Sequence, residues 1–188
     1  MEFELTFSQS DTVVFGFKDS ECEPIDLSEE EPTMISGEIT IDGKKIGELT
    51  GYELYNDYDF YSLCDAVSGD CEVIASAICG KRGYVLKKYL TLPGGDFEKI
   101  FILDNIKIDK EYRNKGIGSA VLKNLPKMLR YQFGYGSNIF LCASDFESAH
   151  NVGFQSETYK NGNKRLINYY KKFGYRVVKN NIMVYNER

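Results

Sequence analysis

The chain has 188 residues, of which 43% are hydrophobic and 14% aromatic, and its formal net charge is −5. This composition is ample for one domain with a single buried core. No segment approaches the length of about 18 apolar residues that a membrane-spanning helix needs, and residues 1–4 lack the basic and apolar regions of a signal peptide. We therefore expect a cytoplasmic protein that binds no membrane, and an acidic chain also argues against nucleic acid as the main partner.

The charge is divided unevenly along the chain. Residues 1–106 contain 8 Lys or Arg and 22 Asp or Glu, a net charge of −14, whereas residues 107–188 contain 15 and 6, a net charge of +9. A positive region attracts a ligand with several negative charges and speeds its association. The second half is therefore expected to bind an anionic ligand, although solvation of helices explains any one of its lysines equally well.

The first segments predict two strands and a loop. Residues 3–7 and 12–17 are short apolar and aromatic runs of the kind found in strands. Residues 19–31 hold seven acidic side chains and no Lys or Arg, which indicates a solvated loop.

Residues 39–47 predict a hairpin. Asp42 and Gly43 lie between alternating apolar residues, and such a pair supplies the positive φ angles of a tight turn. The second strand of the hairpin is expected over residues 48–55.

A helical region follows at residues 61–78, where apolar side chains recur every three or four residues. Gly69 interrupts the pattern, which predicts either one broken helix or two shorter helices. Three of the five cysteines, Cys64, Cys71 and Cys79, lie in or next to this region. Their spacing fits a helix face better than a paired metal-ligand pattern, so we expect free buried thiols and no metal site.

A strand at residues 100–108 leads into the most informative turn of the chain. Before this strand, residues 81–92 are expected to be extended in part, and residues 93–95, Pro-Gly-Gly, are expected to form a turn. After it, residues 113–119 read Arg-Asn-Lys-Gly-Ile-Gly-Ser and precede a helical pattern. The first turn of a helix has unpaired N–H groups and the positive end of the macrodipole, and glycines let an anion approach the backbone. The turn therefore predicts a site for a phosphate or pyrophosphate.

Two familiar phosphate-binding motifs do not fit this turn. A Walker loop requires Lys and then Ser or Thr after its second glycine, but Gly118 is followed by Ser119 and Ala120. A dinucleotide-binding fingerprint requires three glycines at the opening of a doubly wound sheet, and here there are two, in the second half of the chain.

The helical pattern after Gly118 contains Pro126. A proline inside a helix removes a hydrogen bond and clashes with the preceding turn, at a cost of about 3 kcal/mol. We therefore predict a kink or a restart near Leu125.

The last segments predict a strand, a loop and a helix. Residues 139–143 are typical of a strand, and residues 145–162 of a long polar loop. Asn163 is expected to cap the following helix, and Gly174 suits the left-handed position just after it.

Two of these segments, in this order, resemble the GNAT superfamily of N-acetyltransferases. The Arg-x-x-Gly-x-Gly turn after a strand resembles the family's acyl-CoA-binding motif, and residues 163–175 resemble its closing helix. The resemblance covers residues 98–186. It implies one α/β (α+β) domain over residues 1–188, with a mixed, mostly antiparallel sheet that is splayed between two strands and flanked by helices.

The resemblance also implies acetyl-CoA, or another acyl-CoA, as the cofactor. Two isoleucines would pair their backbone with the pantetheine arm, and the turn would hold the pyrophosphate. The residues implied for this role are Ile106, Ile108, Arg113, Asn114, Lys115, Gly116, Ile117, Gly118, Ser119 and Asn163.

Two residues are candidates for catalysis. Tyr170 matches the family's usual general acid, although a place in the core is the alternative, and its neighbour Tyr169 is set aside. Asp104 shares strand parity with Ile102, Ile106 and Ile108 and should point to the same face of the sheet as these three residues. A carboxylate in an apolar strand is costly unless it is paired or used, so Asp104 is either the general base or part of a structural network.

The leading hypothesis is therefore an acetyl-CoA-dependent N-acetyltransferase that acts by direct transfer in a ternary complex. The alternative is a GNAT-fold module that binds acyl-CoA or a protein without turnover. A toxin-like enzyme acting on charged tRNA is disfavoured by the net charge and by the lack of a basic and aromatic stretch. The acceptor, a small-molecule or protein amine drawn to carboxylates such as Asp70, stays open, and so does a homodimeric state.

Overall fold

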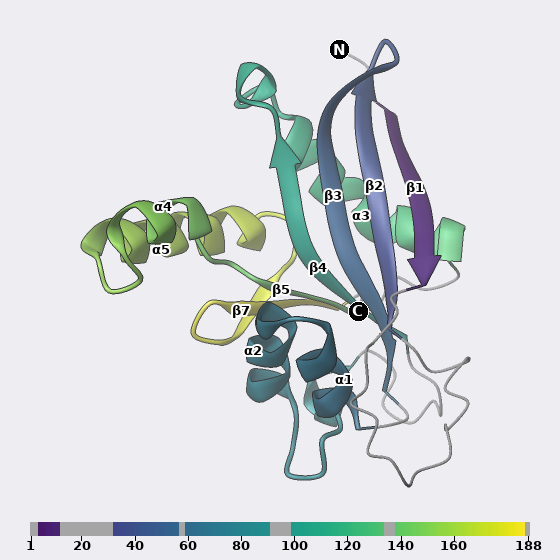
Figure 1. Ribbon diagram of the computed structural model, residues 1–188, viewed down its shortest axis with the longest axis vertical. Helices are drawn as coiled ribbons and strands as arrows, with labels where there is room; N and C mark the ends of the chain where they lie inside the picture. The colour runs from purple at the N-terminus through teal and green to yellow at the C-terminus, as the bar shows by residue number, and fades with distance from the viewer. Residues whose placement is uncertain (1–3, 12–31, 57–58, 91–98, 134–137, 187–188) are drawn as a thin grey trace, which may run out of the picture.

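The computed structural model describes residues 4–11, 32–56, 59–90, 99–133 and 138–186 (Figure 1). Within these residues there are seven strands, five α-helices and two short 3-10 helices. The strands are β1 (Glu4–Asp11), β2 (Thr33–Ile41), β3 (Lys44–Tyr55), β4 (Lys99–Ile108), β5 (Asn138–Cys142), β6 (Arg176–Lys179) and β7 (Ile182–Asn186). The helices are α1 (Phe60–Val67), α2 (Gly69–Ile78), η1 (Lys87–Tyr89), η2 (Lys110–Tyr112), α3 (Ile117–Phe133), α4 (Phe146–Val152) and α5 (Glu157–Lys171).

All seven strands belong to one sheet, in the order β1-β2-β3-β4-β5-β7-β6. Neighbouring strands are antiparallel except β4 and β5, which are parallel and are joined by a crossover that contains α3. This arrangement confirms the predicted fold class, a mixed and mostly antiparallel sheet flanked by helices. None of the helices in the described ranges has the length and apolar character needed to cross a bilayer.

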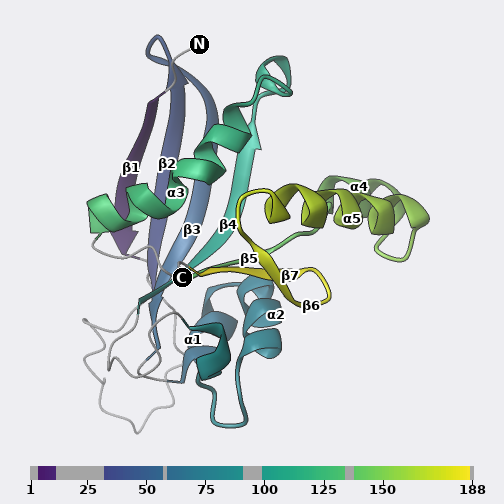
Figure 2. The ribbon, with the colours of Figure 1, turned by 180° about the vertical axis from the view of Figure 1, so that it is seen from behind.

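Helices cover both faces of the sheet (Figures 1 and 2). On one face, α3 closes a core that includes Leu49, Phe101 and Leu125. On the other, α1 and α2 close a second core that includes Phe60 and Ile102. Neighbouring residues of β4 alternate between the two cores, as the pleat of a strand requires. Both faces of β4 are buried from Ile100 to Leu103, so this part of the strand anchors the residues that follow it.

The predicted hairpin is confirmed. Asp42 and Gly43 have φ angles of 51° and 74° and connect β2 to β3. β3 begins at Lys44, four residues earlier than expected. β1 includes part of the first predicted strand, whereas residues 12–17, 19–31 and 93–95 lie outside the described residues.

The helical region at residues 61–78 forms two helices that part at Ser68. This residue is extended, with a φ of −167°, and its hydroxyl accepts a hydrogen bond from the N–H of Cys71 as the N-cap of α2. The cysteines of this region are free thiols, as predicted. Cys64 and Cys71 are buried, which raises the pKa of both thiols, that of Cys71 to about 11.

Of the two predicted alternatives near Leu125, a kink or a restart, the restart is wrong, because α3 runs through Pro126 as a single helix. The proline removes one hydrogen bond from the helix interior. Around it, Leu122, Leu125 and Leu129 are almost completely buried. Burial stabilises each such side chain by about 1.5–3 kcal/mol, which is enough to offset the cost of the proline.

The predicted loop at residues 145–162 is also wrong, since most of it is helical. Asp145 caps α4 by accepting a hydrogen bond from the N–H of Ser148, and Ser156 caps α5 by accepting one from the N–H of Tyr159. Asn163 is therefore an interior residue of α5 and not its N-cap. Gly174, with a φ of 89°, has the predicted left-handed conformation after the helix.

Candidate acyl-CoA site

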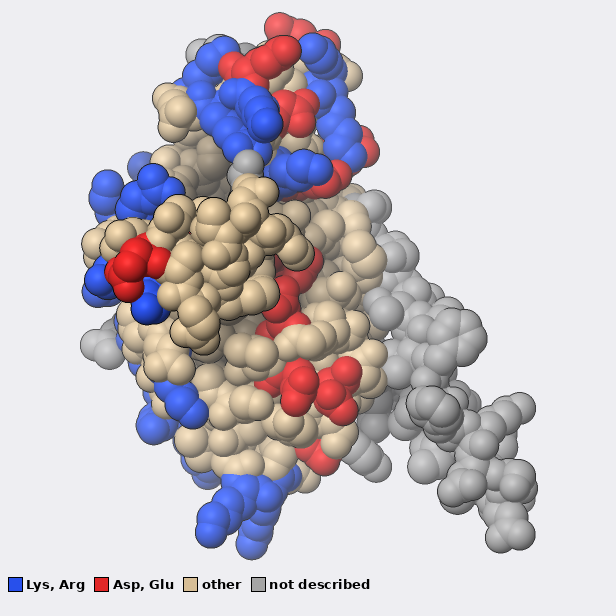
Figure 3. Space-filling model, turned by 60° about the vertical axis from the view of Figure 1, so that its left-hand side comes forward, with Lys and Arg blue, Asp and Glu red and all other residues tan. Residues whose placement is uncertain are grey.

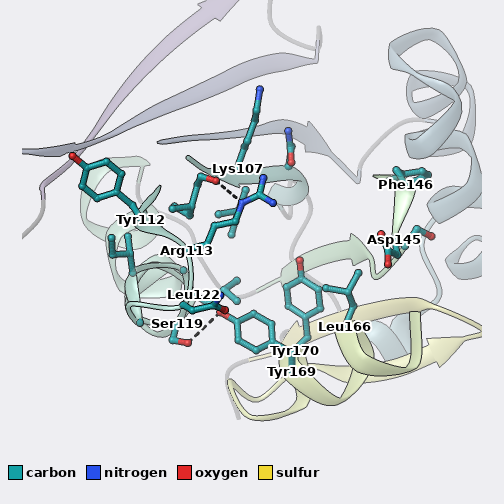
Figure 4. Close-up of a pocket in the computed structure, with 18 residues that line it drawn as sticks. Lys107, Tyr112, Arg113, Ser119, Leu122, Asp145, Phe146, Leu166, Tyr169 and Tyr170 are labelled. Carbon is teal, nitrogen blue, oxygen red and sulfur yellow. Dashed lines mark hydrogen bonds between the residues drawn. The ribbon is translucent and has the colours of Figure 1, made fainter. Parts of the chain in front are cut away.

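A cleft of about 970 Å³ opens where β4 and β5 part (Figure 4). The two strands pair only from Phe101 and Ile139 to Leu103 and Leu141, and beyond this point β4 continues without β5 beside it. A cleft of this size is typical of small-molecule sites. Its lining consists of Asn105, Ile106, Lys107, Ile108, Tyr112, Arg113, Asn114, Gly116, Ile117, Gly118, Ser119, Leu122, Ser144, Asp145, Phe146, Leu166, Tyr169 and Tyr170.

The glycine turn forms one end of this cleft. Asn114 and Gly116 have positive φ angles of 61° and 84°, and a Cβ added at Gly116 would meet open space. The first hydrogen bond of α3 runs from the N–H of Ala120 to the carbonyl of Gly116 over 3.0 Å. The N–H groups of residues 117–119 therefore precede the helical ladder and can bind an anion.

Basic side chains surround the turn. Figure 3 shows Lys and Arg, with Asp and Glu among them, at the end of the molecule where β4 and the β2–β3 hairpin finish. Arg113 lines the cleft and its Nε donates a hydrogen bond to the carbonyl of Ile108 over 2.8 Å. Lys115 does not line the cleft, because its ammonium lies over the ring of Tyr112, 5.0 Å from the centroid. Of the two basic side chains in the turn, Arg113 is thus the one that lines the cleft.

Tyr170 enters the cleft from α5. Figure 4 shows its hydroxyl directed into the cleft between Arg113 and Leu166. Its ring contacts that of Tyr175 edge-on, with the centroids 5.7 Å apart. Burial raises the pKa of Tyr170 to about 12, with smaller contributions from Tyr169 and Cys142. The phenol therefore keeps its proton at neutral pH, as a proton donor must.

Tyr169, which sequence reasoning set aside, also lines the cleft. Its hydroxyl lies 3.1 Å from the hydroxyl of Ser119, in the first turn of α3. The two residues are 50 positions apart, so no local pattern could have paired them. The available signal was helical spacing, because Leu166 and Tyr169 lie on one face of α5 and pack on the same core as Phe173, which follows the helix.

Asp104 lies on the predicted face with Ile102, but its predicted parity with Ile106 and Ile108 is wrong, because β4 contains a β-bulge at Asp104. Leu103 lies opposite Gly51 and Asn105 opposite Thr50, so Asp104 is the extra residue. Beyond the bulge, even-numbered residues of β4 point to the face of the sheet opposite to the one they point to before it. Ile102 belongs to the core under α1 and α2, whereas Ile106 packs against the core under α3.

Asp104 is exposed and lies outside the cleft lining, on the side of α2. The hydroxyl of Thr50 donates a hydrogen bond to its carboxylate over 3.1 Å. Burial raises the pKa of Asp70, at the start of α2, and the charge of Asp104 raises it further. The pKa of Tyr52 is raised mainly by burial and by the charge of Asp104, with smaller contributions from Cys71 and Asp70. Two carboxylates and a phenol therefore lie close enough beside the bulge for the charge of Asp104 to raise the pKa of the other two groups.

Asn163 lies behind the cleft and not in it. Its side-chain oxygen accepts a hydrogen bond from the N–H of Asp145 over 2.7 Å. Asp145 lines the cleft, and a Cβ built on Gly162 would lie 2.7 Å from its Cβ and its Cγ. The role of Asn163 in this structure is to position the start of α4, which differs from the cofactor contact implied by the resemblance.

A polar cluster that the sequence did not indicate follows β5. Ser144 lines the cleft, and its hydroxyl lies 3.1 Å from the sulfur of Cys142. Asn181 donates hydrogen bonds to both residues, and the hydroxyl of Tyr159 donates one to Ser144 over 3.3 Å. This network fixes the wall of the cleft opposite the glycine turn.

No protein-family model and no curated protein matches the chain in sequence. Several solved structures are similar to it. A mutant of the AtaT toxin, bound to acetyl-CoA and the C-terminus of the antitoxin AtaR, is 10% identical, with 97% of this chain and 93% of that chain covered and a TM-score of 0.42. NAA60 of Arabidopsis thaliana in complex with acetyl-CoA is 14% identical, with 81% and 76% covered and a TM-score of 0.45.

AtaT complexed with acetyl-methionyl-tRNAfMet is 11% identical, with 97% and 95% covered and a TM-score of 0.43. At these identities and TM-scores, nothing about activity, substrate or partner follows for this chain. The resemblance to the GNAT fold is supported by this chain's own sheet order, by the parting of β4 and β5 and by the turn before α3.

Proposed function

We propose that the protein is a GNAT-type N-acetyltransferase that uses acetyl-CoA. The observation that carries this proposal is the cleft where β4 and β5 part, with an anion-binding turn at one end and the Tyr170 hydroxyl inside it. An elongated ligand with phosphates at one end and a reactive group further along fits this arrangement, and acetyl-CoA is such a ligand.

The chain's own groups suit each part of the cofactor. The free N–H groups of residues 117–119 and the guanidinium of Arg113 would bind the pyrophosphate. The backbone of Ile106 and Ile108, beyond the last pairing with β5, would bind the pantetheine arm. Bound acetyl-CoA would supply the acetyl group as a thioester.

Two proton transfers are assigned to residues at the two sides of the strand end. Tyr170 would donate its proton to the sulfur as the C–S bond breaks, and its raised pKa keeps it protonated until then. Asp104, directly or through a water molecule, would take a proton from the acceptor ammonium so that the nitrogen can form its bond to the acetyl carbon. The nitrogen would lose its second proton as the C–S bond breaks, and that proton would restore the hydroxyl of Tyr170 through solvent. Asp104 and Asp70 both present their charge on the α2 side, which favours a cationic acceptor.

Mass spectrometry with acetyl-CoA and a panel of amines tests the proposal. The panel contains diamines, an aminoglycoside, peptides with free N-termini or lysines, and charged tRNA, because the exclusion of nucleic acid is still a prediction. We expect a mass increase of one acetyl group on at least one cationic amine, and its loss with Tyr170→Phe. Coenzyme A binding without any acetylation would favour the non-catalytic module, and absence of coenzyme A binding would overturn the proposal.

A further inference from the structure

We infer that Tyr169 is a positioning residue that directs the hydroxyl of Ser119 toward the cofactor phosphates. The inference rests on the proposed function and adds a residue to it. Its basis is the hydrogen bond between the two hydroxyls, which joins α5 to the first turn of α3 over 3.1 Å at the edge of the cleft (Figure 4).

The direction of this hydrogen bond decides what Ser119 can do. A hydroxyl group has one proton to donate and two lone pairs to accept with. If Ser119 donated to Tyr169, its only hydroxyl proton would be used in this hydrogen bond and could not be donated to a ligand. If Tyr169 donates, Ser119 accepts and keeps its own proton for another acceptor. An anion bound at the turn favours the second arrangement, because a hydrogen bond to a charged acceptor is about twice as strong as one between neutral groups.

The surroundings hold the Tyr169 hydroxyl in place. The ring makes edge-on contacts with Phe173 and Tyr170, with centroid separations of 5.1 and 5.7 Å. A Cβ added at Gly118 would lie 3.3 Å from the Tyr169 oxygen. This is tighter than ordinary van der Waals contact, so the absence of a side chain at residue 118 leaves room for the hydroxyl. Gly118 is helical and has no positive φ angle, so the backbone conformation does not require a glycine here. The structural reason for a glycine is the space that the Tyr169 hydroxyl occupies.

The same ring thus contacts both functional parts of the cleft. Its hydroxyl forms a hydrogen bond with Ser119 at the glycine turn, and its ring packs edge-on against the ring of Tyr170. Removing the hydroxyl alone, with Tyr169→Phe, should weaken the binding of the phosphates and leave the packing against Tyr170. The loss should therefore fall on cofactor affinity rather than on turnover at saturating acetyl-CoA.

Calorimetric titration with coenzyme A, and with pantetheine as a ligand without phosphates, tests the inference. Tyr169→Phe and Ser119→Ala should each weaken coenzyme A binding about tenfold, the loss expected for one hydrogen bond to a charged group. The double variant should be no weaker than Ser119→Ala alone, because both changes remove one chain of hydrogen bonds. Pantetheine should bind all the variants equally. Tyr131→Phe, at a tyrosine of α3 that is 94% exposed, is the matched control.

The possible outcomes separate the inference from the function on which it rests. If the wild type binds coenzyme A and Tyr169→Phe binds it equally well, the inference is wrong and the proposed function stands. Equal weakening of coenzyme A and pantetheine would give Tyr169 a merely structural role and would also overturn the inference. If the wild type does not bind coenzyme A, both proposals fail.

Discussion

The hydroxyl of Thr50 donates a hydrogen bond to the carboxylate of Asp104 over 3.1 Å, between β3 and the bulge of β4. The bulge turns this carboxylate toward α2, and the hydrogen bond holds an otherwise exposed side chain in one direction. Asp104 can therefore act on a molecule that approaches from the α2 side while the cofactor cleft lies on the other side of the strand.

Replacement of Asp104 with Asn tests its role as the base. An amide accepts no proton at neutral pH, so kcat/KM for a cationic amine should fall by about 10²–10⁴-fold. The difference in kcat/KM between the wild type and Asp104→Asn should become smaller as the pH rises, because the amine is then deprotonated in solution. Thr50→Val removes the hydrogen bond to Asp104 but leaves its carboxylate in place, so this variant should lower kcat/KM much less. Equal activity of Asp104→Asn and the wild type at pH 7 would show that Asp104 is not the general base and that its role is structural.

Replacement of Tyr170 with Phe tests the proton donor. We expect turnover to fall by about 10²-fold, with little change in acetyl-CoA affinity, since the hydroxyl acts only as the sulfur departs. A tyrosine donates only below its pKa, and that of Tyr170 is raised to about 12, so the wild type should keep its donor as the pH rises through 10. Steady-state kinetics across pH measure both effects. A wild-type loss of turnover centred near pH 10, or equal turnover in the two proteins, would contradict the assignment.

Replacement of Gly162 with Ala should destabilise the protein, although alanine favours helices. The change gains about 1 kcal/mol of helix propensity. The new Cβ, however, would lie 2.7 Å from the Cβ and Cγ of Asp145, and such overpacking costs about 1–3 kcal/mol. Denaturant unfolding should show a net loss of about 1 kcal/mol. Ala substitution of the exposed Asn161, one residue earlier, is the control and should be neutral or stabilising.

The local patterns of the chain predicted the parts of the fold that depend on neighbouring residues. Asp42 and Gly43 at the hairpin, the two helices on either side of Ser68 and the left-handed Gly174 are confirmed, because turn and helix-end chemistry acts over a few residues. The helix α4 was missed although Asp145 and Ser148 form its cap, since its short polar sequence has little apolar periodicity.

The errors at the site have a different cause. The direction of Asp104 depends on a bulge, and the bulge is a property of the pairing with β3, which no pattern within β4 reveals. The contact between Tyr169 and Ser119 depends on how α5 approaches α3. Such relations are set by tertiary packing, so the sequence predicted which segments form the site but not which of their side chains meet.

Replacement of Gly116 with Asp should abolish coenzyme A binding. The residue has a φ of 84°, which strains any residue with a side chain, and the added carboxylate would stand where phosphates are expected. Calorimetry measures the loss. Since no atom lies within 4 Å of a Cβ at this position, the variant should still fold. Undiminished affinity would show that the turn is not the anion site.

Hydrogen exchange on addition of acetyl-CoA is the sharpest test of the acyl-CoA site, because it locates the ligand on the chain without an acceptor. We expect slower exchange at residues 105–119, which form the strand end and the turn, and at residues 166–170 of α5, with no such change in Gly116→Asp. Protection of these segments together would place the cofactor between β4 and α5. Unchanged exchange in both segments, or protection confined to α1 and α2, would contradict the assignment of the cleft as the acyl-CoA site.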